Sequence, residues 1–218
     1  MEQQTVVLIH GLWMPGWEMT LLRYRLRRIG YRVLQFNYAT ISKGITEHAD
    51  DLALFLQRQV NRPVCLIGHS LGGLVALALL QRYPQLAVTQ VIALGSPFRG
   101  SRMAGAVVAW GSLFRRLFGS SWQGGLDGRE SLSVPTGCRV GVIAGTLSWG
   151  VSWLVRVLPQ PNDGLVAVDE TRVEGVCDHI LCRVSHLGLL LSSHVARQIH
   201  YFLVSGRFGV REQRCDGP

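Results

Sequence analysis

Residues 63–80 read Pro-Val-Cys-Leu-Ile-Gly-His-Ser-Leu-Gly-Gly-Leu-Val-Ala-Leu-Ala-Leu-Leu, and this stretch decides the fold. A short apolar run, Val64–Ile67, leads into Gly-His-Ser-Leu-Gly, and a helical apolar pattern follows at once. Such a strand-to-helix turn must be tight, so it forces Ser70 into a strained backbone conformation and presents its hydroxyl at the end of the strand. Gly68 and Gly72 stand where side chains would collide, and Gly73 lets the helix lie close to its neighbours. Ser70 is therefore the candidate nucleophile.

Short apolar runs alternate with helix-length segments along the whole chain, which is typical of a parallel sheet with helices on both faces. The runs predicted as strands are 5–9, 32–36, 64–67, 88–94, 139–144 and 179–184. The segments predicted as helices are 17–29, 46–60, 71–82 and 187–203. The last of these places Leu187, Leu191, Val195 and Phe202 on one stripe. No repeat or linker divides the chain, so we expect a single α/β domain over residues 1–218.

Composition narrows the class of protein. Hydrophobic residues make up 48% and charged residues 17% of the 218 residues, which is typical of a globular chain with a large core. The net charge of +8 is high for this size and favours contact with an anionic membrane surface or an acidic substrate, although solubility alone also explains it. No nucleic-acid-binding motif occurs, so a nucleic-acid partner is not expected. The sequence gives no indication of the oligomeric state.

The cysteines and the amino terminus bear on the compartment. The five cysteines form no C-x-x-C pair and no metal-ligand spacing. Met-Glu-Gln-Gln-Thr-Val carries no basic region followed by an apolar one, so no secretory signal is expected. These features predict reduced thiols in a cytoplasmic protein. The positive charge adds peripheral contact with a membrane as an alternative.

Residues 101–135 break the regular alternation. This segment is rich in Gly and Ser and carries four large aromatic residues near four arginines: Trp110, Phe114, Phe118 and Trp122, with Arg102, Arg115, Arg116 and Arg129. Long segments of this kind in a compact domain are usually functional. We expect a lid or cap whose aromatic face covers the site and meets lipid. The alternative is an ordinary helix packed on the sheet edge.

A serine nucleophile needs a histidine base and an acid that orients it, and with this kind of turn the acid and then the base follow the serine in the chain. Asp163 is the favoured acid because it lies in a turn-rich stretch, Pro-Asn-Asp-Gly-Leu-Val, and Asp169 is the second choice. His186 is the favoured base because it lies between the last strand and the final helix. The other downstream histidines fall within that helix or at the far end of the strand: His194, His200 and His179.

The oxyanion of a tetrahedral intermediate needs two N–H donors. The amide of Leu71 is one, at the start of a helix whose dipole assists it. The amide of Leu12 is the second, because His-Gly at the end of the first strand turns the chain toward the site. Trp13, Met14 and Trp17 follow that turn and are expected to bind the apolar part of a substrate, with core packing as the alternative.

These motifs together resemble the α/β-hydrolase superfamily. The resemblance is to its lipase and esterase branch, namely small bacterial lipase-like proteins and the hydrolase domain of the GPI-inositol-deacylase group. The matching pieces lie in family order over nearly the whole chain: 7–12, 68–73, 94–101, 162–166 and 185–186. Relatives often carry His where this chain has Phe98. The resemblance implies an α/β-hydrolase fold with a mostly parallel central sheet, helices on both faces and a short lid insertion.

The expected activity is carboxyl-ester hydrolysis on acyl esters or lipids through Ser70, His186 and Asp163, with an acyl-enzyme intermediate. No metal and no organic cofactor is expected. Thioester hydrolysis or acyl transfer by the same three residues stays open, because the fold hosts several chemistries. A non-catalytic protein that binds the membrane periphery is the alternative from another class.

Overall fold

Six parallel strands form the centre of the computed structural model, in the order β2-β1-β3-β4-β5-β6. The structure describes residues 3–60, 62–111, 116–122, 125–128, 132–148 and 158–209. The strands are β1 (Thr5–Ile9), β2 (Arg32–Phe36), β3 (Val64–His69), β4 (Val88–Leu94), β5 (Arg139–Gly145) and β6 (Asp178–Cys182). Every residue of β1 and β3 is buried, as expected for central strands covered on both faces. The predicted parallel α/β sheet is confirmed.

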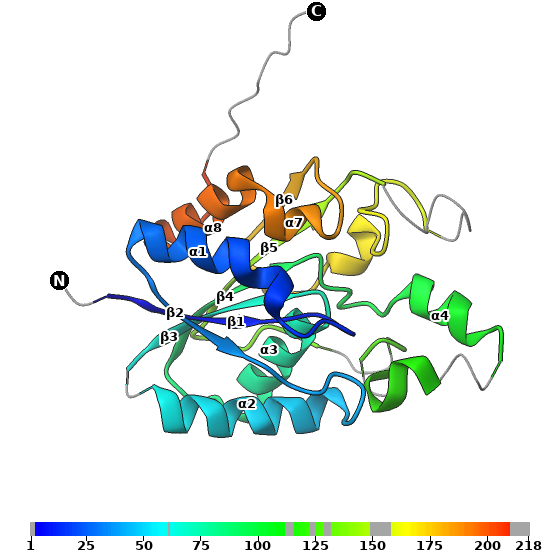
Figure 1. The fold of residues 1–218 in the computed structure, drawn as a ribbon, viewed down its shortest axis with the longest axis horizontal. Coiled ribbons are helices and arrows are strands. Elements are labelled where there is room, and N and C mark those ends of the chain that lie inside the picture. The colour runs from blue at the N-terminus through cyan, green and yellow to red at the C-terminus, as the bar shows by residue number, and fades with distance from the viewer. Residues whose placement is uncertain are drawn as a thin grey trace, which may run out of the picture.

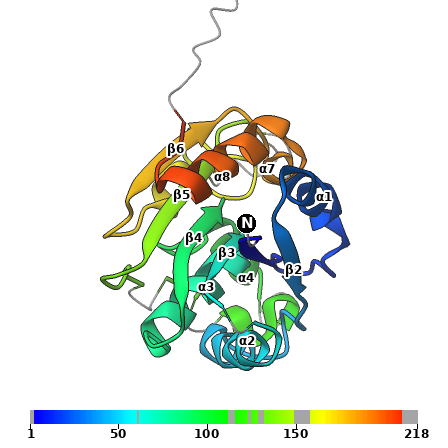
Figure 2. The same ribbon diagram turned by 90° about the vertical axis from the view of Figure 1, so that its left-hand side faces the viewer.

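Helices cover both faces of this sheet (Figure 1). On one face lie α1 (Thr20–Ile29), the short α7 (Gly188–Leu191) and α8 (Ser193–Ser205). On the other lie α2 (Ile45–Gln59) and α3 (Leu71–Arg82), and the end-on view separates the two layers (Figure 2). Each face therefore has its own hydrophobic core, one between the sheet and α2 with α3, the other between the sheet and α1 with α8.

The strand order reverses between β1 and β3, and this reversal positions the site. The chain runs from β1 outward to β2, returns to β3, and then proceeds in the other direction to β6. In the parallel pairing of β1 with β3, Ile9 lies opposite Gly68. The loop after β1 and the turn after β3 therefore leave the sheet side by side, where open α/β sheets bind their ligands.

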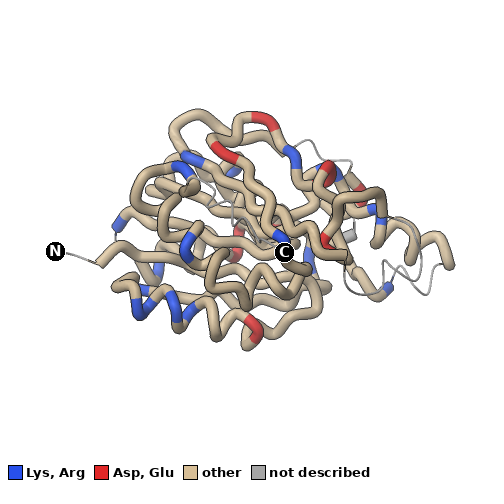
Figure 3. Tube along the Cα trace, turned by 90° about the horizontal axis from the view of Figure 1, so that it is seen from above, with Lys and Arg blue, Asp and Glu red and all other residues tan. Residues whose placement is uncertain are grey.

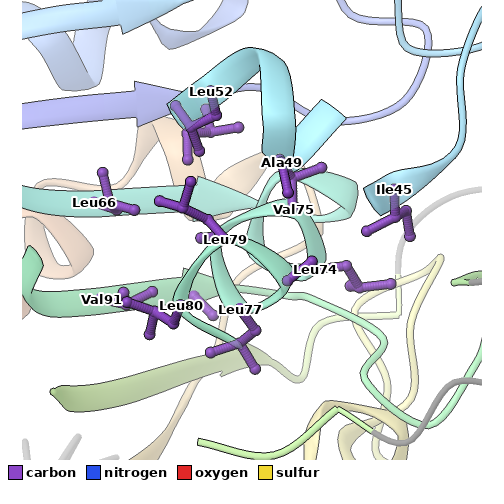
Figure 4. Packing of buried hydrophobic residues seen from close by; sticks show 14 of the residues in the cluster. Ile45, Ala49, Leu52, Leu66, Leu74, Val75, Leu77, Leu79, Leu80 and Val91 are labelled. Carbon is purple, nitrogen blue, oxygen red and sulfur yellow. The ribbon is translucent and has the colours of Figure 1, made fainter. Parts of the chain in front are cut away.

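Helix α3 is buried along almost its whole length (Figure 4). Leu74 and Leu77 are fully buried, as are Leu79 and, on the neighbouring α2, Leu52. Burial of each such side chain contributes about 1.5–3 kcal/mol. The apolar run after Ser70 thus forms a rigid central helix whose amino terminus lies directly behind that serine.

The last helix differs from the prediction. Residues 187–203 were expected to form one helix, but α7 ends at Leu191 and α8 begins at Ser193. Ser192 has extended backbone angles, φ −75° and ψ 128°, and its hydroxyl caps α8 by accepting a hydrogen bond from the Val195 amide. The prediction of a single apolar stripe is therefore wrong, because Val195 is buried whereas Leu187 is 50% and Leu191 53% exposed.

Two other element boundaries differ slightly from the prediction. The predicted strand 179–184 is β6, which ends at Cys182. The predicted helix 17–29 begins with a 3₁₀ turn, η1 (Trp17–Met19), before α1.

The segment 101–135 is described only in part. It contains α4 (Arg102–Val108) and the 3₁₀ turn η2 (Gly119–Trp122). Trp110 is exposed and Phe118 is buried, while Phe114 and the side chain of Trp122 lie outside the described residues. The lid stays a prediction.

Candidate active site

Ser70 has the strained backbone expected of it. Its φ of 53° and ψ of −119° lie in a region that side-chain-bearing residues rarely adopt. Three glycines make the turn sterically feasible. A Cβ on Gly68 would lie 2.4 Å from the Gly73 nitrogen, one on Gly72 would lie 2.3 Å from the Ile9 carbonyl oxygen, and one on Gly73 would lie 2.0 Å from Ser96 Oγ. The local sequence thus fixes where the Ser70 hydroxyl emerges.

His186 and Asp163 form a buried pair beside this turn. Nδ1 of His186 lies 2.7 Å from Oδ2 of Asp163, and the two side chains are 6% and 1% exposed. The other carboxylate oxygen accepts hydrogen bonds from the amides of Leu165 and Val166, at 3.0 and 2.8 Å. The His186 amide donates to the Asp163 carbonyl at 2.8 Å. The carboxylate and the backbone carbonyl of Asp163 therefore both fix the position of His186. The ring nitrogen that does not contact Asp163 is Nε2.

Two glycines at strand ends make room for this pair, and the sequence analysis did not recognise their role. A Cβ on Gly95, after β4, would lie 3.0 Å from Asp163 Oδ2 and 3.1 Å from His186 Nδ1. A Cβ on Gly145, the last residue of β5, would lie 2.6 Å from Asp163 Cβ. The signal that could have revealed them is a glycine at the carboxyl end of two adjacent predicted strands.

The rejected candidates have other partners. Asp169 forms an exposed ion pair with Arg102, at 2.7 Å. His179 contacts the Thr171 hydroxyl at 2.9 Å, and His200 contacts the Tyr31 hydroxyl at 2.8 Å. His194 is exposed on α8. The structure brings Asp163 and His186 together and leaves these four elsewhere.

The two expected oxyanion donors flank Ser70. Leu71 is the first residue of α3, and Leu12 follows the loop after β1. Within the described residues, neither amide is used in a hydrogen bond of the fold. A Cβ on Gly11 would lie 3.2 Å from Ser70 Cβ, so the loop after β1 passes directly against the serine. Both amides are thus free of hydrogen bonds to the described part of the fold, and their role as oxyanion donors stays a prediction.

His10, at the start of the loop after β1, packs against Tyr38. The rings stack with centroids 4.5 Å apart. The Tyr38 hydroxyl donates to the His10 carbonyl at 2.9 Å, and the Tyr38 amide donates to His10 Nε2 at 3.3 Å. Burial lowers the pKa of His10. The imidazole is therefore neutral at pH 7 and can accept that amide hydrogen.

His69 lies against His186, a contact that the sequence analysis did not predict. Its Nε2 lies 3.1 Å from the His186 carbonyl oxygen, and the rings lie 4.6 Å apart. Burial, followed by the proximity of His186, lowers the pKa of His69 well below its usual value. A neutral His69 can donate this hydrogen bond without placing a second charge beside His186.

Ser70 and His186 open into one apolar cavity of about 230 Å³. Trp13 and Met14 line it, as expected, and Met103 and Leu126 line its other side. Trp17 does not line this cavity. It is 74% exposed and lines a neighbouring groove, which Trp13 and Met14 also line, so of the three predicted substrate-binding residues it alone does not reach the cavity of Ser70.

Trp13 separates the cavity from that groove. It is one of two non-glycine residues with positive φ among the described residues, at 57°. Its indole N–H donates to the Leu117 carbonyl at 2.7 Å, and its ring lies 5.1 Å from that of Phe118. The loop after β1 is thereby tied to the 116–122 segment, which contributes Phe118 to the cavity lining.

In the described part of the chain, no three His, Cys, Asp or Glu side chains are grouped so as to hold a metal ion. No helix among the same residues is both long and apolar enough to cross a membrane.

A strained serine after a buried parallel strand, at the point where the strand order reverses and beside a buried histidine–aspartate pair, is typical of α/β hydrolases. The chain belongs to the alpha/beta hydrolase family, whose model matches residues 6–196. This confirms the predicted family and fold. No curated protein sequence matches the chain significantly.

Solved structures of bacterial lipases and esterases share the fold. The mature lipase BlEst2 of Bacillus licheniformis matches with a TM-score of 0.73 and 17% identity over 93% of this chain and 91% of that one. The metagenomic carboxyl esterase MGS0156 matches with a TM-score of 0.64 and 18% identity over 84% and 64%. The phospholipase PlaB of Legionella pneumophila, solved with thio-NAD, matches with a TM-score of 0.65 and 14% identity over 91% and 56%.

Proposed function

We propose that this protein is a serine hydrolase of carboxylic esters, with Ser70 as nucleophile, His186 as base and Asp163 as the acid that orients it. The observation that carries the proposal is the buried 2.7 Å contact between His186 Nδ1 and Asp163 Oδ2 beside a strained serine. Because the carboxylate occupies Nδ1, Nε2 is left to take the proton of Ser70 Oγ in the cavity that both residues line.

The reaction proceeds in two halves. Ser70 Oγ attacks the acyl carbonyl while His186 Nε2 accepts its proton, and the N–H groups of Leu12 and Leu71 stabilise the oxyanion. His186 then protonates the departing alcohol oxygen as the acyl–oxygen bond breaks, which leaves an acyl-enzyme. A water molecule, deprotonated by His186, attacks that ester and returns free Ser70 with the carboxylic acid.

The apolar cavity favours an acyl substrate. Its lining is dominated by carbon atoms of Met14, Met103, Val107 and Leu126, which suit an acyl chain rather than a sugar or a peptide. The lipase, carboxyl esterase and phospholipase neighbours support an ester-bond substrate.

Covalent labelling tests the assignment. A fluorophosphonate probe should label Ser70, and Ser70→Ala should lose both labelling and hydrolysis of p-nitrophenyl butyrate while its circular dichroism spectrum stays unchanged. Ser42→Ala, on an exposed turn, serves as the control and should keep both. Full activity in a folded Ser70→Ala protein would refute the proposal.

A further inference from the structure

A large apolar groove lies beside the cavity, between η1 with α1 on one side and α7 on the other. Its volume is about 760 Å³, and it shares Trp13 and Met14 with the catalytic cavity. The groove exists because the last helix is interrupted at Ser192, which leaves Leu187 and Leu191 facing outward instead of into the core.

The side chains around this groove are unusually apolar for a surface. Trp17, Leu21 and Tyr24 contribute from η1 and α1, opposite Leu187 and Leu191, and all five are exposed. Contiguous exposed apolar patches on soluble proteins usually mark an interaction site. Trp and Tyr combine an apolar ring with a polar group, a combination that is favoured at the boundary between lipid and water.

The surroundings of the groove carry more positive than negative charge, with Glu18 as the acidic residue in its lining. Helix α1 carries four arginines and no acidic residue: Arg23, Arg25, Arg27 and Arg28. Arg25 donates to the Leu191 carbonyl at 2.5 Å, and Arg28 lies over the Tyr24 ring at 5.9 Å. None of the four forms an ion pair with a carboxylate of the described residues. Figure 3 views the molecule from above relative to Figure 1, with the Lys and Arg positions in blue and the Asp and Glu positions in red.

The opposite face of the protein is balanced in charge by ion pairs, because Asp50 pairs with Arg82 at 2.8 Å and Asp51 with Lys43 at 2.6 Å. Helix α2, across the sheet, carries Glu47, Asp50 and Asp51 against one arginine, Arg58. The four α1 arginines therefore lack described carboxylate partners, whereas two of the three α2 carboxylates are neutralised by cations. A flat negatively charged surface would orient the protein with α1 toward it.

We propose that the face formed by η1, α1 and α7 docks on an anionic phospholipid membrane. In this orientation the five exposed side chains around the groove insert among the lipid acyl chains, and the α1 arginines contact the phosphate groups. Because Trp13 and Met14 line both spaces, the mouth of the catalytic cavity faces the same surface. This location differs from the 101–135 segment on which lipid contact was expected.

A second copy of the chain fits this face less well. In a symmetric dimer the same patch meets itself, so two sets of four arginines would approach each other, with Glu18 as the described groove-lining carboxylate of each copy. An anionic membrane satisfies both the apolar groove and the positive charge around it.

Sedimentation with vesicles tests the proposal independently of catalysis. The Ser70→Ala protein is mixed, without substrate, with vesicles of pure phosphatidylcholine or of equal parts phosphatidylcholine and phosphatidylglycerol. Binding to the anionic vesicles should be at least about tenfold tighter and should weaken with added salt. Leu21→Glu combined with Leu191→Glu should weaken it by about tenfold or more, because each change removes an inserted apolar side chain.

Matched controls come from α2. Leu54→Glu, an exposed leucine on the far face, should leave vesicle binding within about twofold. Arg28→Gln should weaken binding about fivefold, whereas Arg58→Gln should not. The same substitutions are also made in the protein that retains Ser70. There, every variant should hydrolyse the water-soluble p-nitrophenyl acetate normally, which separates loss of docking from failure of the proposed chemistry.

The proposal is overturned if anionic vesicles do not bind the protein, or if the Leu54 and Arg58 variants lose binding as much as the groove variants do. A dimer that the Leu21 and Leu191 substitutions dissociate would also overturn it and identify a second copy as the occupant. Light scattering on the same samples distinguishes that outcome.

Discussion

Asp163 reaches His186 through both its carboxylate and its backbone. Oδ2 lies 2.7 Å from Nδ1, and the Asp163 carbonyl accepts the His186 amide at 2.8 Å. These contacts connect two loops that are separated in the sequence. The Asp163 loop lies near the carboxyl end of β5 and the His186 loop follows β6, and the two contacts fix their relative position. A substitution that changes only the carboxylate should leave the relative position of the two loops unchanged.

Asp163→Asn tests this separation of roles. The backbone contact persists, but a neutral amide cannot stabilise the imidazolium and presents the wrong tautomer to Ser70. We expect kcat for p-nitrophenyl butyrate to fall by about 10⁴-fold, with a thermal midpoint close to that of the unaltered protein.

The matched control is Asp169→Asn, since Asp169 was the alternative acid. Its ion pair with Arg102 is solvent-exposed, and such pairs contribute little. Activity should stay within about twofold. If the two variants exchanged these results, Asp169 would be the acid.

Gly72→Ala tests whether the close approach of α3 to β1 is required. The added methyl group would lie 2.3 Å from the Ile9 carbonyl oxygen, and neither backbone can yield without moving a buried element. We expect the free energy of unfolding to fall by about 3 kcal/mol, measured by urea denaturation. Gly44→Ala, where the nearest atom is 3.6 Å away and φ is −74°, should cost less than about 1 kcal/mol. Equal costs at the two positions would contradict the steric explanation.

Much of this site follows from the sequence because its constraints are local. Gly68, Gly72 and Ser70 specify the turn by sterics, and parallel strands bring every loop at their carboxyl ends to one edge. The break at Ser192 was not predicted, because a helical apolar period continues through it and only the capping hydroxyl of that serine marks the new start. The roles of Gly95 and His69 depend on contacts with residues far along the chain, which local periodicity does not reveal.

Val107→Trp tests the acyl cavity under the proposed function. Val107 lines the cavity from α4, so a larger ring there shortens the available space. The ratio of kcat/KM for p-nitrophenyl octanoate to that for the acetate should fall about tenfold, because only the longer chain meets the ring. Val204→Trp, on the exposed side of α8, is the control and should leave the ratio unchanged. A fall of the same size for both esters would show that the ring disturbs the nucleophile rather than the chain-binding space.

Buried histidines predict how stability depends on pH. Burial is the largest cause that lowers the pKa of His10, His48, His69 and His179 from 6.5. Because the unfolded chain binds protons at a higher pH than the folded one, acid favours unfolding. The stabilisation is complete above about pH 6.5 and is lost as the pH falls below that value, by up to about 1.4 kcal/mol per pH unit for each histidine.

His48→Leu isolates one of these contributions. His48 is buried on α2 with its ring 4.6 Å from that of Tyr38. Leucine has no proton to gain, so the slope of the unfolding free energy against pH, measured in urea between about pH 7.5 and 5, should decrease by up to one proton. The exposed His194, changed to Leu, should leave the slope unaltered. A slope that is insensitive to His48→Leu would mean that His48 binds its proton equally well in the folded and the unfolded protein, which would contradict the effect of burial.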